Sequence, residues 1–284
     1  MKVIFRLLVL VLSTQLLFAT TATEQEAERD RSIMMNLNWI NGPTKVNVGS
    51  NSTFDVPEGF VFLNPKDTET LMELFHNPKS SQNRYYFSPE DMSWFGLFSY
   101  ENTGYIKDDE KIDDYKALES FKKGTQEGNK IRIKNGWEPM KILGWKYSPF
   151  YDSQTQRLTW AIDAISGNDP IINYNTRILG RSGVTSVTLV ASPNNLEKDV
   201  SEFKNSINGY RFNRDDTYAS FKEGDKVAEY GLMALIAGGA AAVATKKGLW
   251  AVIAGAFAAF WKLIIAGFVA LLVGIGKFFG KKDN

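Results

Sequence analysis

A long apolar run near the C-terminal end most limits how this chain can fold. Between Leu249 and Ile275 the only charged residue is Lys262, and fourteen residues are Leu, Ile, Val or Phe. Those fourteen favour membrane insertion by roughly 6 kcal/mol, whereas a central lysine opposes it by roughly 3 kcal/mol. As a helix the run would be about 40 Å long, which exceeds a hydrocarbon layer of roughly 30 Å, so the lysine can extend to one membrane face. We therefore predict a transmembrane segment over residues 248–276, with interfacial anchors at Trp250, Trp261 and Lys277.

The first 40 residues are predicted to hold an export signal and a linker. Residues 1–22 combine Lys2 and Arg6 with a short apolar run and end in small residues, the pattern of a cleaved secretory signal. An uncleaved N-terminal anchor is the alternative. Residues 23–40 begin with a charged stretch, and we expect them to be a flexible lead-in.

Two further segments flank the apolar run. Residues 229–247 are rich in Gly and Ala and too short to span comfortably, so they are either a juxtamembrane helix or half of a membrane hairpin. Residues 277–284 form a basic tail, which favours a cytoplasmic C-terminus if the chain crosses once. Small residues recur at i+4 in Ala251, Gly255 and Ala259, a spacing that favours association between the C-terminal helices.

The formal charge of +1 conceals an acidic body. Residues 23–229 hold 25 basic and 31 acidic side chains, whereas both ends of the chain are basic. Nucleic acid is excluded as a partner, because binding phosphates needs a basic face on the folded part. The chain has no Cys and a single His, His76, which excludes disulfides, thiol chemistry and multi-His metal sites. We predict neither a metal nor a cofactor.

Residues 41–228 are predicted to form an exported α+β domain, with an antiparallel sheet and a few packed helices. The strands follow one another without the strand and helix alternation of a parallel sheet. We expect an early meander, two long late hairpins and three helices, the first capped by Asp67 and the second by Asp113 or Asp114. The expected strands are 46–48, 53–56, 60–63, 94–100, 140–147, 156–165, 171–179 and 184–191, and the expected helices are 67–75, 113–133 and 196–207.

An acidic run provides the first candidate site. Lys107, Asp108 and Asp109 lie just before Asp113 and Asp114. Several carboxylates together can bind Ca²⁺, but the alternating spacing of a calcium loop is missing. The favoured interpretation is that these charges stabilise the positive N-terminal end of the following helix.

A polar row on one strand provides the second candidate site. In an extended chain Asn173, Asn175 and Arg177 project on the same face. We expect the Arg177 guanidinium to pair with a carboxylate, because an unpaired buried charge is costly. The expected partners are Asp225 or Glu229 first and Asp108 or Asp109 second, and Arg181 in the following turn belongs to the same polar cluster. A bound ligand anion is the alternative.

Several segments carry a resemblance to a known family. They are Gly42-Pro43, Val56-Pro57-Glu58-Gly59-Phe60, Gly104-Tyr105-Ile106-Lys107-Asp108-Asp109, Gly144-Trp145, Asn173 to Gly180 and Asp225 to Gly231. With them, the chain resembles the bacterial family named domain of unknown function 2167, described as predicted membrane-anchored proteins. The resemblance implies a bacterial envelope protein and brings no established activity. The order of the helix and late hairpins is also similar to the PsbP-like antiparallel fold, an analogy of architecture alone.

These observations favour a binding or scaffold module over an enzyme. We expect it at the cytoplasmic (inner) membrane with the bulk of the chain in the periplasm, where it contacts the lipid bilayer and an envelope protein or associates with itself through the C-terminal helices. Two alternatives stay open. One is a carboxylate-dependent hydrolase that uses Asp108 or Asp109, and the other is a small oligomeric pore formed by the C-terminal segments and lined by Lys262.

Overall fold

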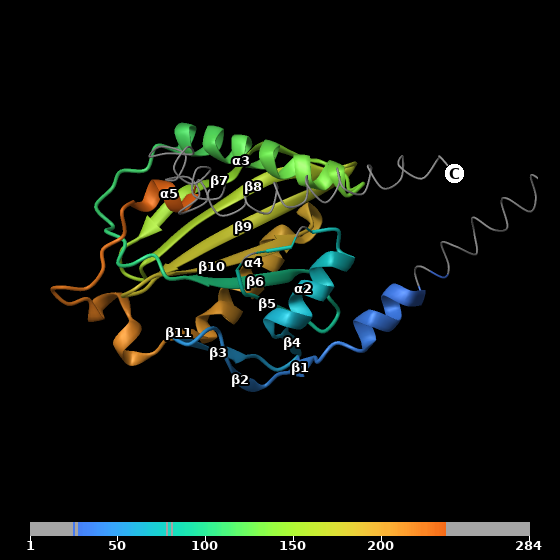
Figure 1. Ribbon diagram of the computed structural model, residues 1–284, viewed down its shortest axis with the longest axis horizontal. Helices are drawn as coiled ribbons and strands as arrows, with labels where there is room; N and C mark the ends of the chain where they lie inside the picture. Colours follow the sequence, from blue (N-terminus) through green and yellow to red (C-terminus); the bar gives the residue numbers. More distant parts are fainter. Residues whose placement is uncertain (1–24, 26–27, 78, 81, 237–284) are drawn as a thin grey trace, which may run out of the picture.

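The domain is built on two antiparallel sheets with helices on both sides (Figure 1). The computed structural model describes residues 25, 28–77, 79–80 and 82–236. The larger sheet has eight strands in the order β1-β4-β5-β6-β10-β9-β8-β7, and the smaller has three in the order β11-β3-β2. The predicted α+β class with an antiparallel sheet is confirmed. The predicted segment 248–276 lies outside the described residues, and none of the described helices is long and apolar enough to cross a membrane.

The elements have the following bounds. The strands are β1 Ile40–Asn41, β2 Thr44–Asn47, β3 Ser52–Val56, β4 Phe60–Leu63, β5 Arg84–Pro89, β6 Phe95–Glu101, β7 Met140–Asp152, β8 Arg157–Ser166, β9 Asp169–Leu179, β10 Val184–Ala191 and β11 Tyr210–Phe212. The helices are α2 Pro65–Leu74, α3 Asp114–Lys134, α4 Leu196–Ser206 and α5 Leu232–Ile236, with short 3₁₀ turns at Pro193–Asn195, Ile207–Gly209, Arg214–Asp216 and Tyr218–Ser220.

The two late hairpins form as predicted, β7 with β8 and β9 with β10. β7 is longer than expected and pairs with β8 through three irregularities of register. In the second hairpin Arg177 lies opposite Ser186, and the pairing continues into β6, where Ser186 lies opposite Ser99. These registers decide which side chains share a face of the sheet.

The predicted early meander is wrong. β2 and β3 pair as expected, but β4 does not follow β3 into the small sheet. It pairs with β1 and β5 in the large sheet, and all four of its residues are buried. A continuous apolar run such as Phe60–Leu63 fits a strand that is covered on both faces of its sheet. The neighbouring strand β5 was not predicted.

Helix α3 runs from the predicted cap at Asp113 to the predicted end at Asn135. Helix α2 begins at Pro65 and is capped by Asn64 instead of Asp67, since the Asn64 side chain accepts hydrogen bonds from the amides of Lys66 and Asp67. The lead-in also differs from the expectation, because residues 28–35 are helical. Met34, Leu37 and Trp39 pack against the domain, and this apolar contact was hidden behind the preceding charges.

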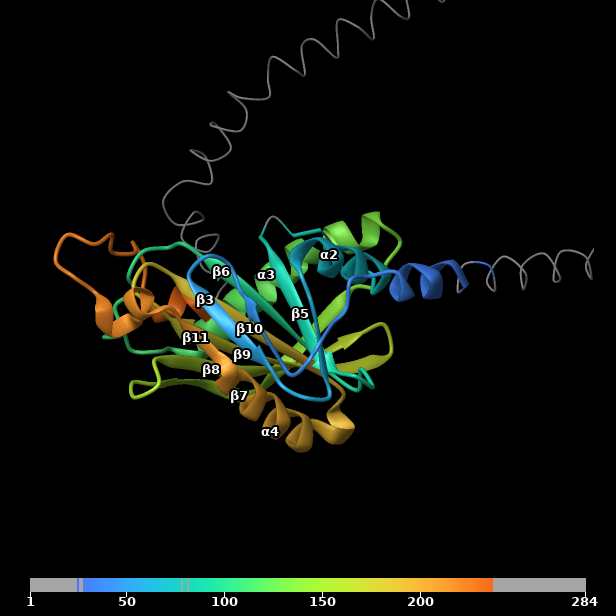
Figure 2. The same ribbon diagram turned by 90° about the horizontal axis from the view of Figure 1, so that it is seen from below.

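Three apolar clusters pack the helices and the small sheet against the large sheet. One face packs against the small sheet and α4, through residues such as Phe54, Phe98 and Phe203. The other face is covered at one side by α3 and α5 and at the other side by α2. Figure 2 shows α4 on one side of the sheet and α2 and α3 on the other. Between α2 and α3, the middle of this second face on β6, β10 and β9 stays partly exposed.

Candidate functional site

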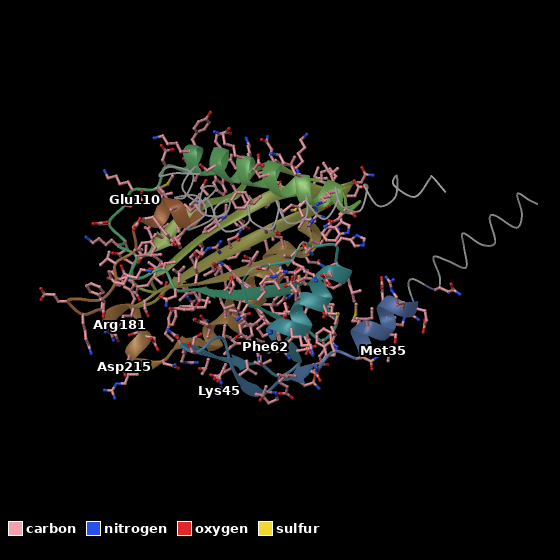
Figure 3. The ribbon with its side chains drawn as sticks, in the orientation of Figure 1. Met35, Lys45, Phe62, Glu110, Arg181 and Asp215 are labelled. Atoms are coloured by element: carbon pink, nitrogen blue, oxygen red, sulfur yellow. The ribbon has the colours of Figure 1, made fainter. Side chains whose placement is uncertain are left out.

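Three segments that are far apart in sequence meet at one end of the molecule. They are the loop 103–110 after β6, the turn 180–183 between β9 and β10, and residues 222–233, which lead into α5. We call this meeting point the C-terminal junction. Glu110, Arg181 and Asp215 lie at this end in Figure 3, opposite the end that carries Met35. Each of the three segments contains residues that the sequence singled out.

An ion pair joins the β9–β10 turn to the C-terminal segment. Arg181 Nε and Nη2 each donate to one carboxylate oxygen of Asp225, both at 2.7 Å. The backbone amide of Lys222 also donates to Asp225 Oδ2, at 2.7 Å. The hydrogen bonds from the Arg181 side chain and the Lys222 backbone lower the pKa of Asp225 to about 2. A two-point contact of this kind fixes orientation as well as distance.

Backbone contacts extend the junction beyond the ion pair. Tyr105 forms a parallel bridge with Val227, in which its amide donates to Lys226 O at 2.8 Å and its carbonyl accepts from Ala228 N at 2.8 Å. Gly104, with a φ of +92°, lies so close that a Cβ there would be 2.7 Å from Lys226 O. Only glycine combines this backbone conformation with so close an approach.

Aromatic rings cover this bridge. The Tyr105 ring stacks on Tyr218 with centroids 4.4 Å apart and contacts Phe221 at 4.1 Å. The Tyr218 hydroxyl donates to Ile106 O at 2.9 Å. Burial, reinforced by Tyr105, raises the pKa of Tyr218 well above its usual value. The phenol of Tyr218 is therefore neutral, and its ring packs beside the bridge.

The acidic run is part of the same junction. Asp108 accepts a hydrogen bond from the Tyr151 hydroxyl at 2.8 Å, which adds to burial in raising the pKa of that tyrosine. Glu110 accepts from the Met233 amide at 3.0 Å, in the first turn of α5. Asp113 caps α3, as predicted, while Lys107 and Asp109 are exposed. No cluster of three or more potential metal ligands is found among the described residues.

The predicted pairing of Arg177 is wrong. Asp225 is taken by Arg181, four residues further along the chain, and none of the ion pairs within the described part includes Arg177. The reason is geometric. Arg181 lies in the turn beyond the ends of β9 and β10, where its side chain reaches Asp225, whereas Arg177 lies on a face of β9 within the sheet. Glu229 is exposed between Asp225 and α5.

Arg177 instead stacks on an indole ring. Its Cζ lies 4.7 Å from the ring centroid of Trp160, which is fully buried on the neighbouring strand. Nη1 donates to the carbonyl of Thr176 at 3.3 Å, the single hydrogen bond that the guanidinium forms within the described residues. Burial lowers the pKa of Arg177 to about 10, and the charge of Glu101 partly opposes this shift. The group is therefore partly desolvated and its hydrogen-bonding capacity is largely unused.

The two predicted amide side chains, Asn173 and Asn175, lie on the same face but differ in their hydrogen bonding. Asn175 is satisfied, since its Nδ2 donates to Asn173 O at 3.1 Å and its Oδ1 accepts from Thr188 at 3.0 Å. Asn173 Oδ1 is buried and, among the described residues, has no hydrogen-bond partner. The predicted shared face is thus confirmed, but the three side chains do not act as one donor set.

The sequence missed the residues that define these surroundings. No local sequence pattern predicts that an aromatic ring will contact a guanidinium or a backbone bridge. The sequence therefore offers no reason to single out Trp160, Tyr105, Tyr218 and Phe221. Ser99 and Ser186 could have been found only from the register of β6, β10 and β9. The predicted membrane residues Trp250, Trp261, Lys262 and Lys277 lie outside the described residues.

Comparison with known proteins places this chain in a family. Residues 40–271 match the family model described as protein of unknown function, DUF2167. The chain therefore belongs to that family, as the motifs predicted, and the match includes all three segments of the C-terminal junction. None of the curated proteins matches the sequence.

Four chains among the solved structures match this one, and an example has weak similarity. It is the solution structure of cyanobacterial PsbP (CyanoP) from Synechocystis sp. PCC 6803, with a TM-score of 0.37 and 8% identity over 60% of this chain and 92% of that chain. This similarity is too low to assign a shared fold or a shared function.

Proposed function

We propose that this protein is a membrane-anchored binding module of the bacterial envelope. Its α+β domain would face the periplasm, and its C-terminal segment would lie in the inner membrane, crossing it once. In this proposal the domain presents a surface to a ligand or to an envelope protein, and the small residues of the C-terminal segment favour association between copies.

The C-terminal junction is the observation that carries this proposal. The Arg181 to Asp225 pair and the Tyr105 to Val227 bridge tie residues 222–228 to the sheet. The apolar run begins at Leu249, about 20 residues later. A module that must hold a binding surface at a set orientation benefits when the start of its C-terminal segment is fixed to the domain, as residues 222–228 are here, whereas a tethered hydrolase works equally well on a loose segment. The contact of Asp108 with Tyr151 also gives that carboxylate a structural role.

Topology can be tested with single cysteines, because the native chain has none. Lys123→Cys lies at an exposed position of α3 and Lys281→Cys lies in the basic tail. In spheroplasts a membrane-impermeant maleimide should label the first and label the second only after lysis. Protection of Lys123→Cys in intact spheroplasts would overturn the proposed orientation. Labelling of both Lys123→Cys and Lys281→Cys in intact spheroplasts would show that the C-terminal part forms a hairpin instead of crossing once.

Binding can be tested by purification of the full chain in a mild detergent. Co-purification of a specific envelope protein or defined self-association is expected. Recovery as a monomer with neither partner nor ligand would count against the binding role even if the topology is correct.

A further inference from the structure

We infer that the partly exposed sheet face between α2 and α3 binds a tetrahedral oxyanion, such as the phosphate group of a monoester, with Arg177 as the main donor. This inference names a ligand class for the proposed binding module and therefore rests on that proposal. It starts from a row of four polar residues that the strand registers place side by side.

The row crosses four neighbouring strands. Arg84 on β5 lies opposite Ser99 on β6, Ser99 lies opposite Ser186 on β10, and Ser186 lies opposite Arg177 on β9. Directly opposite residues point to the same face, so all four side chains share one surface. With strands about 4.8 Å apart, the two arginines are separated by about 14 Å at their backbones, and both serines lie between them.

Three of the four residues in this row, Arg177, Ser99 and Ser186, have donors available, whereas Arg84 is paired with Glu69. All four residues are partly exposed, unlike the opposite face of the same strands, where Phe98, Val187 and Leu189 are fully buried. The hydroxyls of Ser99 and Ser186 form no hydrogen bond within the described residues. Glu101 lies on the same face but forms no ion pair with Arg177, so its carboxylate does not occupy the guanidinium.

The position of Arg177 suits the binding of an anion in the plane of its guanidinium. Trp160 covers one flat side of the group, and only one in-plane donor, Nη1, is used within the described residues, so the other N–H groups are free to donate. Trp160 Nε1 is itself buried, and no described residue accepts from it. Stacking on an indole holds the charge in a defined orientation without using its hydrogen bonds.

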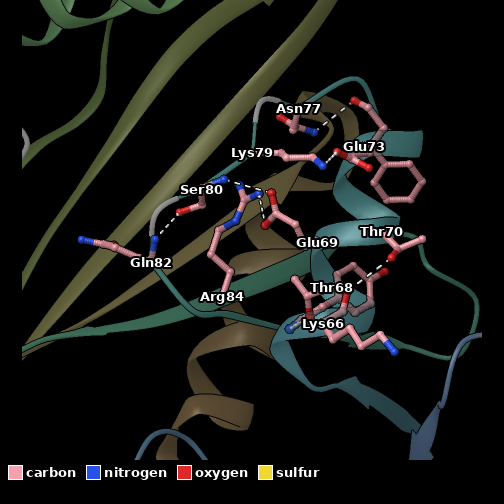
Figure 4. Close-up of polar contacts among 12 residues, drawn as sticks. Lys66, Thr68, Glu69, Thr70, Glu73, Asn77, Lys79, Ser80, Gln82 and Arg84 are labelled. Carbon is pink, nitrogen blue, oxygen red and sulfur yellow. Dashed lines mark hydrogen bonds and ion pairs between the residues drawn. The ribbon is translucent and has the colours of Figure 1, made fainter. Parts of the chain in front are cut away.

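The far end of the row carries a second arginine, which is already paired with a carboxylate. Arg84 Nη2 donates to Glu69 Oε2 at 2.9 Å, and Glu69 Oε1 accepts from Ser80 N, which fixes the loop beside α2 (Figure 4). The row therefore holds two guanidinium groups and one paired carboxylate. Glu101 lies on the same face, so the patch carries no excess of positive charge, and anion binding would depend on the guanidinium of Arg177, which forms no ion pair within the described residues.

The arrangement favours a tetrahedral group over a flat carboxylate. A carboxylate is satisfied by one planar guanidinium fork alone. A phosphate has additional oxygens outside that plane, and hydroxyls from two neighbouring strands can donate to them. Free phosphate and a phosphomonoester share this chemistry.

Thermal unfolding of the full chain in a neutral detergent tests the inference. At constant ionic strength, inorganic phosphate should raise the Tm relative to chloride, and Arg177→Met should weaken phosphate binding at least tenfold. Ser186→Ala should weaken it less. The matched control is Arg157→Met, since Arg157 lies on β8 on the other face of the sheet, where it contacts Asn208, and this change should leave phosphate binding intact.

A second ligand separates the two sources of the oxyanion. Glycerol 3-phosphate should bind more tightly than inorganic phosphate if the site recognises a phosphomonoester, and equally if it recognises the free anion. No stabilisation by either ligand, or stabilisation that survives Arg177→Met, overturns the inference. Co-purification of an envelope protein without any phosphate effect would leave the proposed binding role standing and remove only the ligand class.

Discussion

Two arginines on the same hairpin, four residues apart, have opposite surroundings. Arg181, in the turn, donates two hydrogen bonds to Asp225 and holds the C-terminal segment. Arg177, on β9, stacks on Trp160 and, within the described part of the chain, donates only to a neighbouring backbone carbonyl. The difference indicates that Arg181 stabilises the contact between the hairpin and the C-terminal segment. Arg177 instead has donors left for a ligand outside the domain.

The surroundings of the two arginines explain why both arrangements are tolerated. The Arg181 pair lies where solvent still reaches it, and such pairs contribute modestly to stability but can fix geometry when they are bidentate. Arg177 is held by an aromatic face, an interaction that compensates partly for lost hydration. A carboxylate beside Arg177 would satisfy it internally and close the polar row. Substitutions in the C-terminal junction and on the sheet face test this division of roles.

Gly104→Ala should damage the C-terminal junction most. The new Cβ would require a positive φ and would approach Lys226 O, so we expect unfolding free energy to fall by about 2–4 kcal/mol in urea titrations. Gly124→Ala in α3 is the matched control, because no atom lies within 4 Å of its Cβ position. That change should stabilise the protein by about 0.5–1 kcal/mol. Equal effects of the two substitutions would contradict the close packing of the bridge.

Arg181→Met and Asp225→Asn should each lower the Tm by about 2–4 °C, a usual size for a modest loss in a domain of this length. Because the two side chains contact each other directly, the double variant should lose no more than the worse single variant. Additive losses in this double-mutant cycle would rule out the pairing.

The same pair predicts a pH dependence. Folding lowers the pKa of Asp225 from 3.8 to about 2, so its stabilising effect is complete above about pH 4 and is lost as the pH falls toward 2. Melting curves between pH 5 and pH 2 should therefore bring wild type and Arg181→Met closer together as the solution becomes acidic. A gap that stays constant over this range would show that the aspartate is not the partner.

Arg177→Met should have the smallest effect on the protein without ligand. The change removes a cation–π contact and also a partly desolvated charge, so these losses and gains offset each other to within about 1 kcal/mol. A loss of about 3 kcal/mol, the scale for breaking a buried ion pair from one side, would instead indicate a partner for Arg177 inside the folded chain.

Much of the fold could be predicted because its signals are local. Helix α3 has a capping aspartate at one end and Asn135-Gly136 at the other, and the two late hairpins combine alternating apolar residues with turn residues. The sheet in which β4 pairs could not be predicted in this way, because the pairing partners of a buried strand can be distant in sequence. The same limit explains the missed β5 and the packing of residues 34–39.

The candidate sites show the same limit more sharply. The sequence identified the strand that carries Arg177 and the segment that carries Asp225. In the structure the segment contacts the β9–β10 turn, and the strand carries the polar row. The sequence assigned Asp225 to Arg177 instead of Arg181. Which arginine reaches Asp225 depends on the position of the β9–β10 turn beyond the ends of the strands. Ser186 lies 9 residues and Ser99 lies 78 residues from Arg177 in the sequence, and only the sheet register places the three residues in one row.

The most direct test compares the two arginines in one experiment. Full-length wild type, Arg181→Met and Arg177→Met are melted in neutral detergent with phosphate or with chloride at equal ionic strength. We predict that Arg181→Met lowers the Tm in chloride but keeps the phosphate shift, whereas Arg177→Met keeps the chloride Tm and loses the phosphate shift. The reverse pattern, or an unchanged phosphate shift in Arg177→Met, would contradict the division of roles between the C-terminal junction and the sheet face.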